Sequence, residues 1–552
     1  DGGVVLGEGT AAVMSSSSSD EERMGYGAVD IAAMEKEEKI RENDGYPAWM
    51  AFIYTFNLII GVGAISTPKG FQLAGLDLST LVLIFIAFFA YVSITYVIEA
   101  MSSANAYLRL RGTHPEGEEE TGEAEPINKA GSHLSMEVEA ALSDDEAERI
   151  RKGEQLYNIT EKVEMGQMAN LFCGKAWETV FYVILVVYLF GDLAIYAVSV
   201  PQSLEYITAD LFEEGSSVAE NLYYVYLAAF ALCIIPFCFF NFQKTKYLQY
   251  MTIMLRNAAF LVMAVLCWIR LGKGNGSDLS RMTYFDIKRF PDLFGIVIYS
   301  FMAHHSIPSI VTPVEDKRNI YVIMAYVYSA VLGVYILFNY SAVLAFGDPC
   351  TTCFDGEFCG QMEDLFTEMF ADYKIRTLGV FLGMYPVITL SSSYPLIAIT
   401  LRNNLMTMIP YGKEGRFRIW RQVIFSAIAS IPPILLAFAT QSVDTLVNIT
   451  GAYGGVGIQW FIPIILIYFS RKRMAELAPG IPNPHRSRFS HNAWLYVILG
   501  LVIISVIMST LNIILQFLDV NQSDIPTDPE ELDLYCEELS GRDTDNVIIL
   551  GS

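Results

Sequence analysis

Repeated apolar runs of about 20 residues are the feature that most limits what this chain can fold into. Each run is long enough to cross roughly 30 Å of hydrocarbon as a helix. The sequence therefore predicts an all-α, polytopic membrane protein with about eleven transmembrane helices. The runs fall near residues 47–74, 78–101, 178–200, 222–240, 247–271, 292–314, 320–346, 376–400, 419–440, 447–470 and 492–518.

The charged residues are separated from these runs. The formal net charge is −24, yet 53% of the residues are hydrophobic and only 17% are charged. Such a composition excludes an ordinary soluble enzyme, and the acidic balance would repel the phosphates of a nucleic acid. The expected partners are the lipid bilayer and a small-molecule substrate, and the sequence names no protein partner.

Polar stretches flank and interrupt a predicted membrane domain at 47–518. Residues 1–46 lack the apolar core of a signal peptide and are predicted to be a flexible cytosolic tail. Residues 103–165 are predicted to be a disordered acidic cytosolic loop, and 519–552 an acidic non-cytosolic tail.

Lysine and arginine in the short loops indicate the orientation of the helices. They concentrate in loops on the side of the N-terminus, whereas the loop 201–221 contains acids and no base. The loop 272–290, with four basic residues, does not follow this rule. The majority predicts a cytosolic N-terminus and an extracellular or lumenal C-terminus. The choice between the plasma membrane and a lysosomal or endosomal membrane stays open.

Four cysteines fall on the predicted non-cytosolic side, where disulfides persist. They allow three pairings, and a structural zinc site is the alternative. These cysteines are Cys350, Cys353, Cys359 and Cys536. Asn275 and Asn521 lie in sequons on the same side and are predicted to be glycosylated.

Two of the apolar runs are interrupted at mid-span. The first contains Gly61 and Gly63 before Pro68, and the sixth contains the string SFMAHHSIP at 300–308. Backbone groups left unpaired in hydrocarbon are costly, so such breaks persist only beside a cavity or inside protein. The two runs begin two groups of five helices. The pattern favours an inverted-repeat transporter, whereas close helix packing at the glycines is the alternative.

Helix dipoles then indicate the cargo. The half-helix that begins at a break suits a carboxylate, and the half-helix that ends there suits a cation or an ammonium group. A zwitterion is therefore the natural substrate. The predicted substrate site comprises Asn57, Gly61, Val62, Gly63, Ala64, Ser300, Ala303, His304 and His305.

Ionisable groups inside the runs are functional candidates. Asp192 binds a proton or cation, or else steadies Tyr196 or nearby backbone. His304 titrates near physiological pH and gates or couples transport, or else satisfies freed carbonyls. Lys69 closes an outer gate by pairing with an acid, or else snorkels. Tyr453 and Gly454 are predicted as a gate and a hinge.

Six strings resemble the transmembrane protein 104 family, a branch of the amino acid/auxin permease superfamily. They are EKVEMGQMANLF (161–172), YLFGDLAIYAVSVP (188–201), QKTKYLQ (243–249), YSFMAHHSIPSIVTPV (299–314), AITLRNN (398–404) and NITGAYGGVGIQ (448–459). The resemblance implies the LeuT-type fold, with a 5+5 inverted repeat plus one helix, and an amino acid as substrate.

The resemblance also implies positions for a coupling ion. The pattern Asn57-x-x-x-Gly61-x-Gly63 is similar to the first helix of sodium-coupled neutral amino acid transporters, where the asparagine helps to hold sodium. Ser393, beside Ser392, matches a cation-binding threonine position, although both hydroxyls have their own helix as an alternative partner. Serine in place of threonine and the doubled histidine keep a proton in competition with sodium.

The sequence thus predicts a secondary active transporter of small neutral amino acids that works by alternating access. A Na⁺ or H⁺ gradient drives it, and no cofactor or metal is expected. The alternative is an amino acid sensor or scaffold on a transporter fold. An enzyme is not expected, because the chain contains no HExxH, GxSxG or Walker motif.

Overall fold

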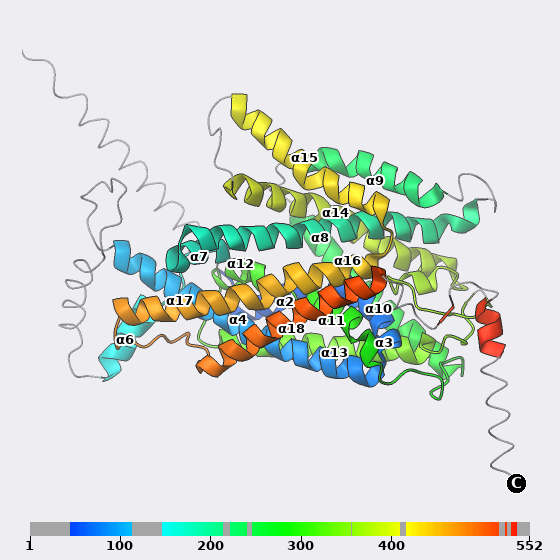
Figure 1. Cartoon of the computed structure of the whole chain (residues 1–552), viewed down its shortest axis with the longest axis horizontal. Helices are drawn as coiled ribbons and strands as arrows, with labels where there is room; N and C mark the ends of the chain where they lie inside the picture. The colour runs from blue at the N-terminus through cyan, green and yellow to red at the C-terminus, as the bar shows by residue number, and fades with distance from the viewer. Residues whose placement is uncertain are drawn as a thin grey trace, which may run out of the picture.

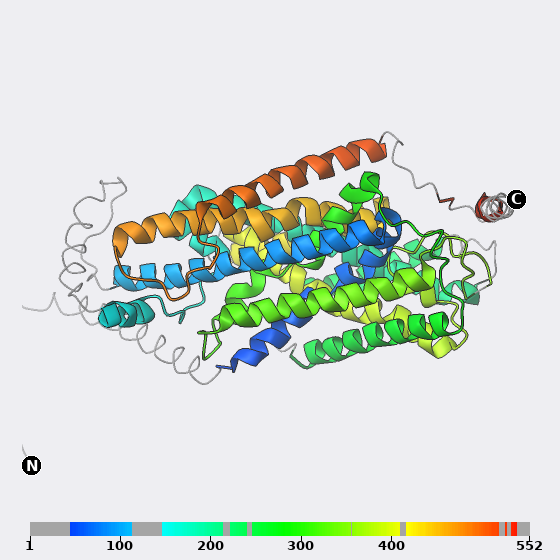
Figure 2. The same ribbon diagram turned by 90° about the horizontal axis from the view of Figure 1, so that it is seen from below.

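The computed structural model describes residues 45–112, 146–212, 221–239, 246–354, 356–408, 416–517, 525–526 and 531–537. Within these ranges, regular structure is helical apart from two isolated bridges, Tyr46 with Val314 and Thr352 with Phe358. The long helices run side by side in one elongated bundle (Figure 1, Figure 2). The first 44 residues and the predicted glycosylation site Asn521 lie outside the described residues.

The prediction of an all-α membrane protein is confirmed. Nine helices in the described ranges are long and apolar enough to cross a membrane, and the bent pair α2–α3 forms a tenth span. The shorter apolar helix α9 lies at the remaining predicted run. The helices at the predicted runs are α2 (Ala48–Ile59), α3 (Val62–Ala74), α4 (Leu76–Gly112), α8 (Lys175–Thr208), α9 (Leu222–Cys238), α10 (Lys246–Gly272), α11 (Phe290–Ser300), α12 (Ile307–Val311), α13 (Ile320–Phe346), α14 (Arg376–Met408), α15 (Arg416–Ala439), α16 (Val443–Ile449), α17 (Ile462–Leu477) and α18 (Asn492–Phe517).

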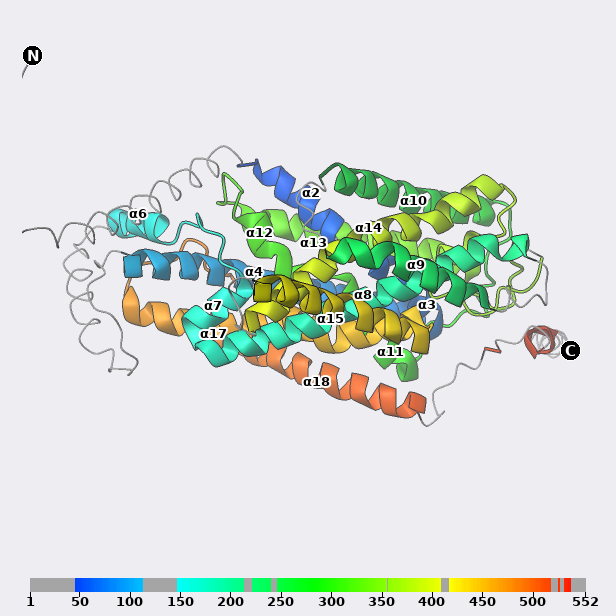
Figure 3. The same ribbon diagram turned by 90° about the horizontal axis from the view of Figure 1, so that it is seen from above.

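Burial separates central helices from peripheral ones. In the most apolar window of the α11–α12 span 83% of the residues are buried, whereas in α18 only 17% are. Figure 3 shows α10 and α18 at opposite edges of the bundle. A helix that is apolar all round suits either place, because lipid and protein interior are both apolar. The span α11–α12 therefore lies in the core, and α18 faces the surroundings.

The two ends of the bundle differ in chemistry. The disulfide end consists of residues 347–375 and the short helix 531–537, which Cys350–Cys536 joins, while Cys353 pairs with Cys359. The basic end consists of the last turns of α4 and α17 and the segment 478–491 that leads to α18. Figure 1 places these two groups at opposite ends of the long axis. The exposed Asn275 belongs to a loop at the disulfide end, through the hydrogen bond of the neighbouring Ser277 to Leu344.

The predicted disordered loop 103–165 is wrong at both of its ends. Residues 103–112 continue α4, and α6 (Glu146–Leu156) and α7 (Met165–Cys173) follow beyond the undescribed residues 113–145. Asn105 of α4 accepts hydrogen bonds from the backbone N–H groups of Thr160 and Glu161, and Arg109 donates to the Leu156 carbonyl. These few polar side chains fix the returning chain against α4, which the acidic average of the segment did not indicate.

Candidate functional site

The first predicted break lies between α2 and α3, which are bent by 54° relative to each other. Gly61 stands at the bend, with a φ of −139° that other residues also adopt. A Cβ atom at Gly61 would meet nothing within 4 Å. The glycine therefore borders open space in the middle of the first span.

The sixth span is also broken where the sequence predicted. α11 ends at Ser300, a 3-10 turn covers His304–Ser306, and the five-residue α12 begins at Ile307. The residues between α11 and the turn, including Ala303, are fully buried or nearly so. The break is therefore enclosed by protein and not by lipid, as the cost of unpaired backbone groups requires.

The hydroxyl of Tyr335 on α13 joins the two breaks. It lies 3.1 Å from the carbonyl oxygen of Ile59 and 2.9 Å from that of Ser300, so its single hydrogen is shared between the two acceptors. Gly63 packs against the same point, because a Cβ atom there would lie 2.7 Å from the hydroxyl oxygen of Ser300. The two interrupted helices therefore meet inside the bundle, side by side.

Arg256 of α10 holds the end of α2. Its Nη1 donates to the carbonyl oxygens of Asn57 and Ile60, each at 2.5 Å. The neighbouring Asn257 donates to the side-chain oxygen of Asn57 at 3.2 Å. A guanidinium at a helix C-terminus stabilises the carbonyls that lack partners there. The carbonyl groups at the end of α2 are thus bound by a cationic side chain of the protein, the guanidinium of Arg256.

Asp192 of α8 is buried, with 6% of its surface exposed, and accepts a hydrogen bond of 2.7 Å from the hydroxyl of Tyr299 on α11. An aromatic row leads away from this pair. The ring of Tyr188 lies 6.2 Å from that of Tyr299 and 5.5 Å from that of His305. Asp192 therefore steadies the core helix α11, which neither predicted alternative named, and His305 lies at the far end of the row.

His304 does not face the same space. Its Nε2 lies 2.8 Å from the hydroxyl of Ser93 and 3.1 Å from the Ala90 carbonyl, both on α4, and the residue is fully buried. Of its two predicted roles, this geometry matches the satisfaction of backbone carbonyls. Val62 and Ala64 are likewise buried in the first turn of α3.

Ser392 and Ser393 form hydrogen bonds within α14. Both hydroxyls donate to the carbonyl of Thr389, at 2.8 Å and 2.9 Å. This matches the alternative in which they bond to their own helix. Neither serine has a hydrogen bond to α2 in the described structure.

Tyr453 and Gly454, predicted as a gate and a hinge, contact the helices α18 and α8 in the structure. The Tyr453 hydroxyl lies 2.8 Å from that of Thr510 on the peripheral α18, an exposed contact. A Cβ atom at Gly454 would lie 2.8 Å from the backbone of Tyr188 on α8. The glycine therefore allows close packing of the π-helical segment Thr450–Gly455 on α8.

At the disulfide end, a loop covers α3. Lys69 Nζ lies 2.5 Å from Asp364 Oδ1, and the other oxygen of Asp364 accepts from the backbone N–H of Asp444. The backbone N–H of Phe366 donates to the Ile65 carbonyl at 2.9 Å. Lys69 was predicted either to pair with an acid or to snorkel, and in the structure it forms the ion pair.

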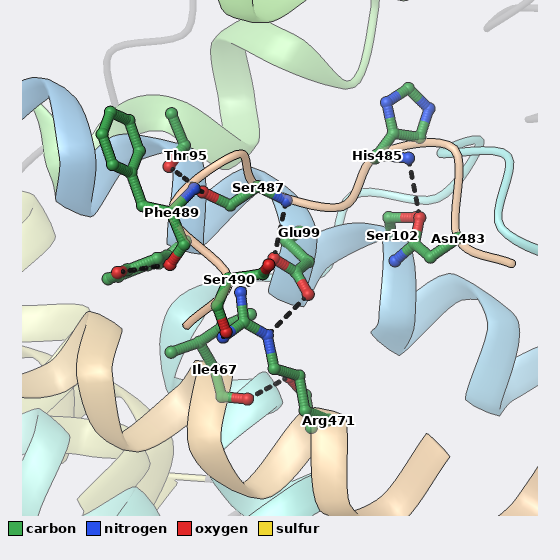
Figure 4. A network of polar contacts seen from close by, with 12 residues as sticks. Thr95, Glu99, Ser102, Ile467, Arg471, Asn483, His485, Ser487, Phe489 and Ser490 are labelled. Atoms are coloured by element: carbon green, nitrogen blue, oxygen red, sulfur yellow. Dashed lines mark hydrogen bonds and ion pairs between the residues drawn. The ribbon is translucent and has the colours of Figure 1, made fainter. Parts of the chain in front are cut away.

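At the basic end, a buried ion pair closes the bundle (Figure 4). Arg471 of α17 donates to both oxygens of Glu99 on α4, at 2.8 Å and 2.7 Å. Ser487 adds its backbone N–H to Glu99 at 2.8 Å, and Arg471 also donates to the Ser490 carbonyl. Glu99 is only 3% exposed, so it fastens α4, α17 and the segment before α18 together.

Sequence reasoning missed the residues that hold the breaks in place. Arg256 is a basic residue inside an apolar run, which is rare enough in membrane helices to have marked it as functional. Tyr335 and Tyr299 gave no comparable indication, because tyrosines are frequent in this chain.

Comparison with known proteins gives consistent matches. Residues 155–515 match a family model described as transmembrane amino acid transporter protein. Transmembrane protein 104 of Homo sapiens is 38% identical over 496 residues, which cover 85% of this chain and 97% of that protein. The Dictyostelium discoideum homolog is 36% identical over 494 residues, covering 86% and 98%. The Caenorhabditis elegans homolog is 29% identical over 520 residues, covering 85% and 97%.

Proposed function

Because the chain belongs to the transmembrane amino acid transporter family, together with the transmembrane protein 104 proteins, we propose that it is a secondary active transporter of small neutral amino acids. The supporting observation is the meeting of the two broken helices at Tyr335 beside the open space at Gly61. The first and sixth spans are the broken ones, which fits a 5+5 inverted repeat plus one helix.

The substrate binds at the open space. The first N–H groups of α3 have no partner within their helix and form the positive end of its dipole, so they attract the carboxylate of an amino acid. The carbonyl groups at the C-terminal end of α11 form the negative end of its dipole and attract the ammonium group. The two helix ends together therefore provide opposite partial charges for the carboxylate and the ammonium group of a zwitterion.

A proton and not sodium is the coupling ion. The oxygens of Asn57 that would hold sodium already accept from Arg256 and Asn257. The hydroxyls of Ser392 and Ser393 donate to Thr389. Asp192 is the buried carboxylate next to the sixth span, and its charged form is costly there. Protonation of Asp192 in one state and its release in the other couples transport to a pH gradient.

Alternating access requires the two ends to open in turn. The Lys69–Asp364 pair closes the disulfide end, and the Glu99–Arg471 pair closes the basic end. Each pair joins segments that are far apart in the chain. Opening one end therefore means breaking one pair while the other persists.

Uptake of radiolabelled neutral amino acids into proteoliposomes tests the proposal. We expect a pH gradient to drive accumulation when choline replaces sodium, and Asp192→Asn to abolish accumulation while exchange across the membrane continues. Uptake that requires sodium would overturn the proton assignment. Binding without net uptake or exchange would contradict transport and support the sensor alternative.

Gly61→Val is the sharpest test of the site. The new side chain enters the open space, and the φ of −139° tolerates it, so we expect an unchanged melting temperature and the loss of uptake. Gly63→Val is the matched control, because it overlaps Ser300 and should lower the melting temperature. Normal uptake by a folded Gly61→Val variant would remove the substrate from this position.

A further inference from the structure

Resting on the proposed function, we propose that Arg256 recognises the carboxylate of the substrate, so that a free carboxylate is what admits a compound to this transporter. The other edge of the same guanidinium already holds the end of α2.

Some of the N–H donors of the guanidinium bind α2, and others remain for a ligand. Both printed bonds to α2 come from Nη1, whose two hydrogens are used by the carbonyls of Asn57 and Ile60. Nε is buried and has no hydrogen-bond partner in the described structure. Nε and Nη2 form the planar edge of arginine that matches a carboxylate, and a carboxylate bound to Nε would share this edge with the hydroxyl of Tyr385. A buried donor on that edge without a partner is unfavourable, and a bound carboxylate would supply the partner.

The charge of Arg256 is also not neutralised nearby. Within the described residues, no carboxylate forms an ion pair with it, and its side-chain partners besides α2 include the hydroxyl of Tyr385. A cation inside a membrane bundle normally lies near an anion or a water-filled space. The carboxylate of a substrate supplies that anion.

The position of the guanidinium agrees with this role. The Ile60 carbonyl that it holds immediately precedes Gly61, where the open space lies. The first N–H groups of α3 point to the same region, so that helix dipole and guanidinium attract one anion together.

Asp192 belongs to the surroundings of the same region. Tyr196 of α8 interacts electrostatically with both Arg256 and Asp192. Arg256 holds the end of α2 at the first break, and Asp192 accepts from Tyr299 of the sixth span. A zwitterion bound at the open space beside Ile60 therefore has its carboxylate toward Arg256.

The test uses the purified full chain in detergent and a panel of neutral L-amino acids, each beside its own methyl ester. Binding is measured by thermal shift and by competition. The ester keeps the side chain and the ammonium group and lacks only the carboxylate charge. In the unmodified protein we expect at least one acid to bind at least tenfold more tightly than its ester.

Variants then assign this preference to Arg256. Arg256→Gln should reduce the difference between acid and ester at least tenfold, and Arg256→Lys, which keeps the charge without the planar edge, should reduce it by less. Arg270→Lys is the matched control, because Arg270 lies on the same helix and also donates to carbonyls, those of Ala345 and Thr352. This control should keep the difference.

The outcomes separate the two proposals. If Arg256→Gln only lowers the melting temperature and keeps the preference for the acid, Arg256 merely caps α2 and the inference is wrong. Equal binding of acid and ester by the unmodified protein overturns it as well, even where the variants do not fold. If no amino acid is bound or transported by the unmodified protein, the proposed function itself fails.

Discussion

At the scale of single residues, one hydroxyl group connects the two halves of the candidate site. Tyr335→Phe removes the donor that serves the carbonyls of Ile59 and Ser300. Buried carbonyls left without a partner cost about 1–3 kcal/mol, so we expect a lower melting temperature and slower uptake. Tyr328→Phe is the control on the same helix, since its hydroxyl makes one longer bond of 3.4 Å. An effect no larger than that of the control would mean that Tyr335 does not hold the breaks together.

Glu368 in the loop at the disulfide end gives the protein a dependence on pH. Burial, and then the charges of Glu363 and Asp364, raise the pKa of this carboxyl well above its ordinary value of 4.5. The folded state therefore binds this proton more tightly than the unfolded chain does. The resulting stabilisation is complete below the ordinary pKa and decreases as the pH rises above it.

Glu368→Gln, which is neutral at every pH, should make the melting temperature fall less steeply between about pH 5 and pH 8. Scanning calorimetry across that range measures the effect. The exposed Glu357, in the same loop, provides the control Glu357→Gln. Identical pH profiles for Glu368→Gln and the unmodified protein would show that this carboxyl does not titrate between the two states.

At the scale of helices, the breaks in the first and sixth spans were predictable because glycine, proline and polar residues inside an apolar run are local features. The partners of these breaks were not. Tyr335 is 276 residues from Ile59, and Arg256 is 199 residues from Asn57, so only the packed bundle brings them together. The sequence likewise left two possible partners for the hydroxyls of Ser392 and Ser393, a cation or a carbonyl of their own helix. In the structure both hydroxyls donate within α14.

The Glu99–Arg471 pair joins two helices, α4 and α17, so its contribution to stability can be tested at the scale of helices. Glu99→Gln or Arg471→Met leaves one charge buried alone, and each should lower the stability by about 3 kcal/mol. The double variant should lose less than the sum of the two, because neither charge is then left unpaired. Thermal denaturation in detergent provides the comparison. Arg318→Gln removes an exposed pair with Asp316 and should leave the stability almost unchanged, because solvent screens exposed pairs. Additive losses in the double variant would show that the two side chains act independently.

At the scale of the whole molecule, the number and place of the apolar runs followed from the sequence, since span length and hydropathy are properties of single segments. At the ends of the bundle, the sequence offered an ion pair of Lys69 with an acid but not its partner, and it did not indicate the Glu99–Arg471 pair, because both pairs join distant segments. The acidic composition of residues 103–165 also gave no indication of local order, although Thr160 and Glu161 pack on α4. The candidate site could therefore be located from sequence, whereas its charged side chain could not.

The loop over α3 has a practical consequence. Its contacts to the first span, through Asp364 and Phe366, come from residues 347–375, which belong to the disulfide end of the bundle. An antibody fragment that grips residues 347–375 would immobilise one conformation without entering the bilayer. Such a reagent would serve both as an inhibitor and as a rigid fiducial for imaging the particle.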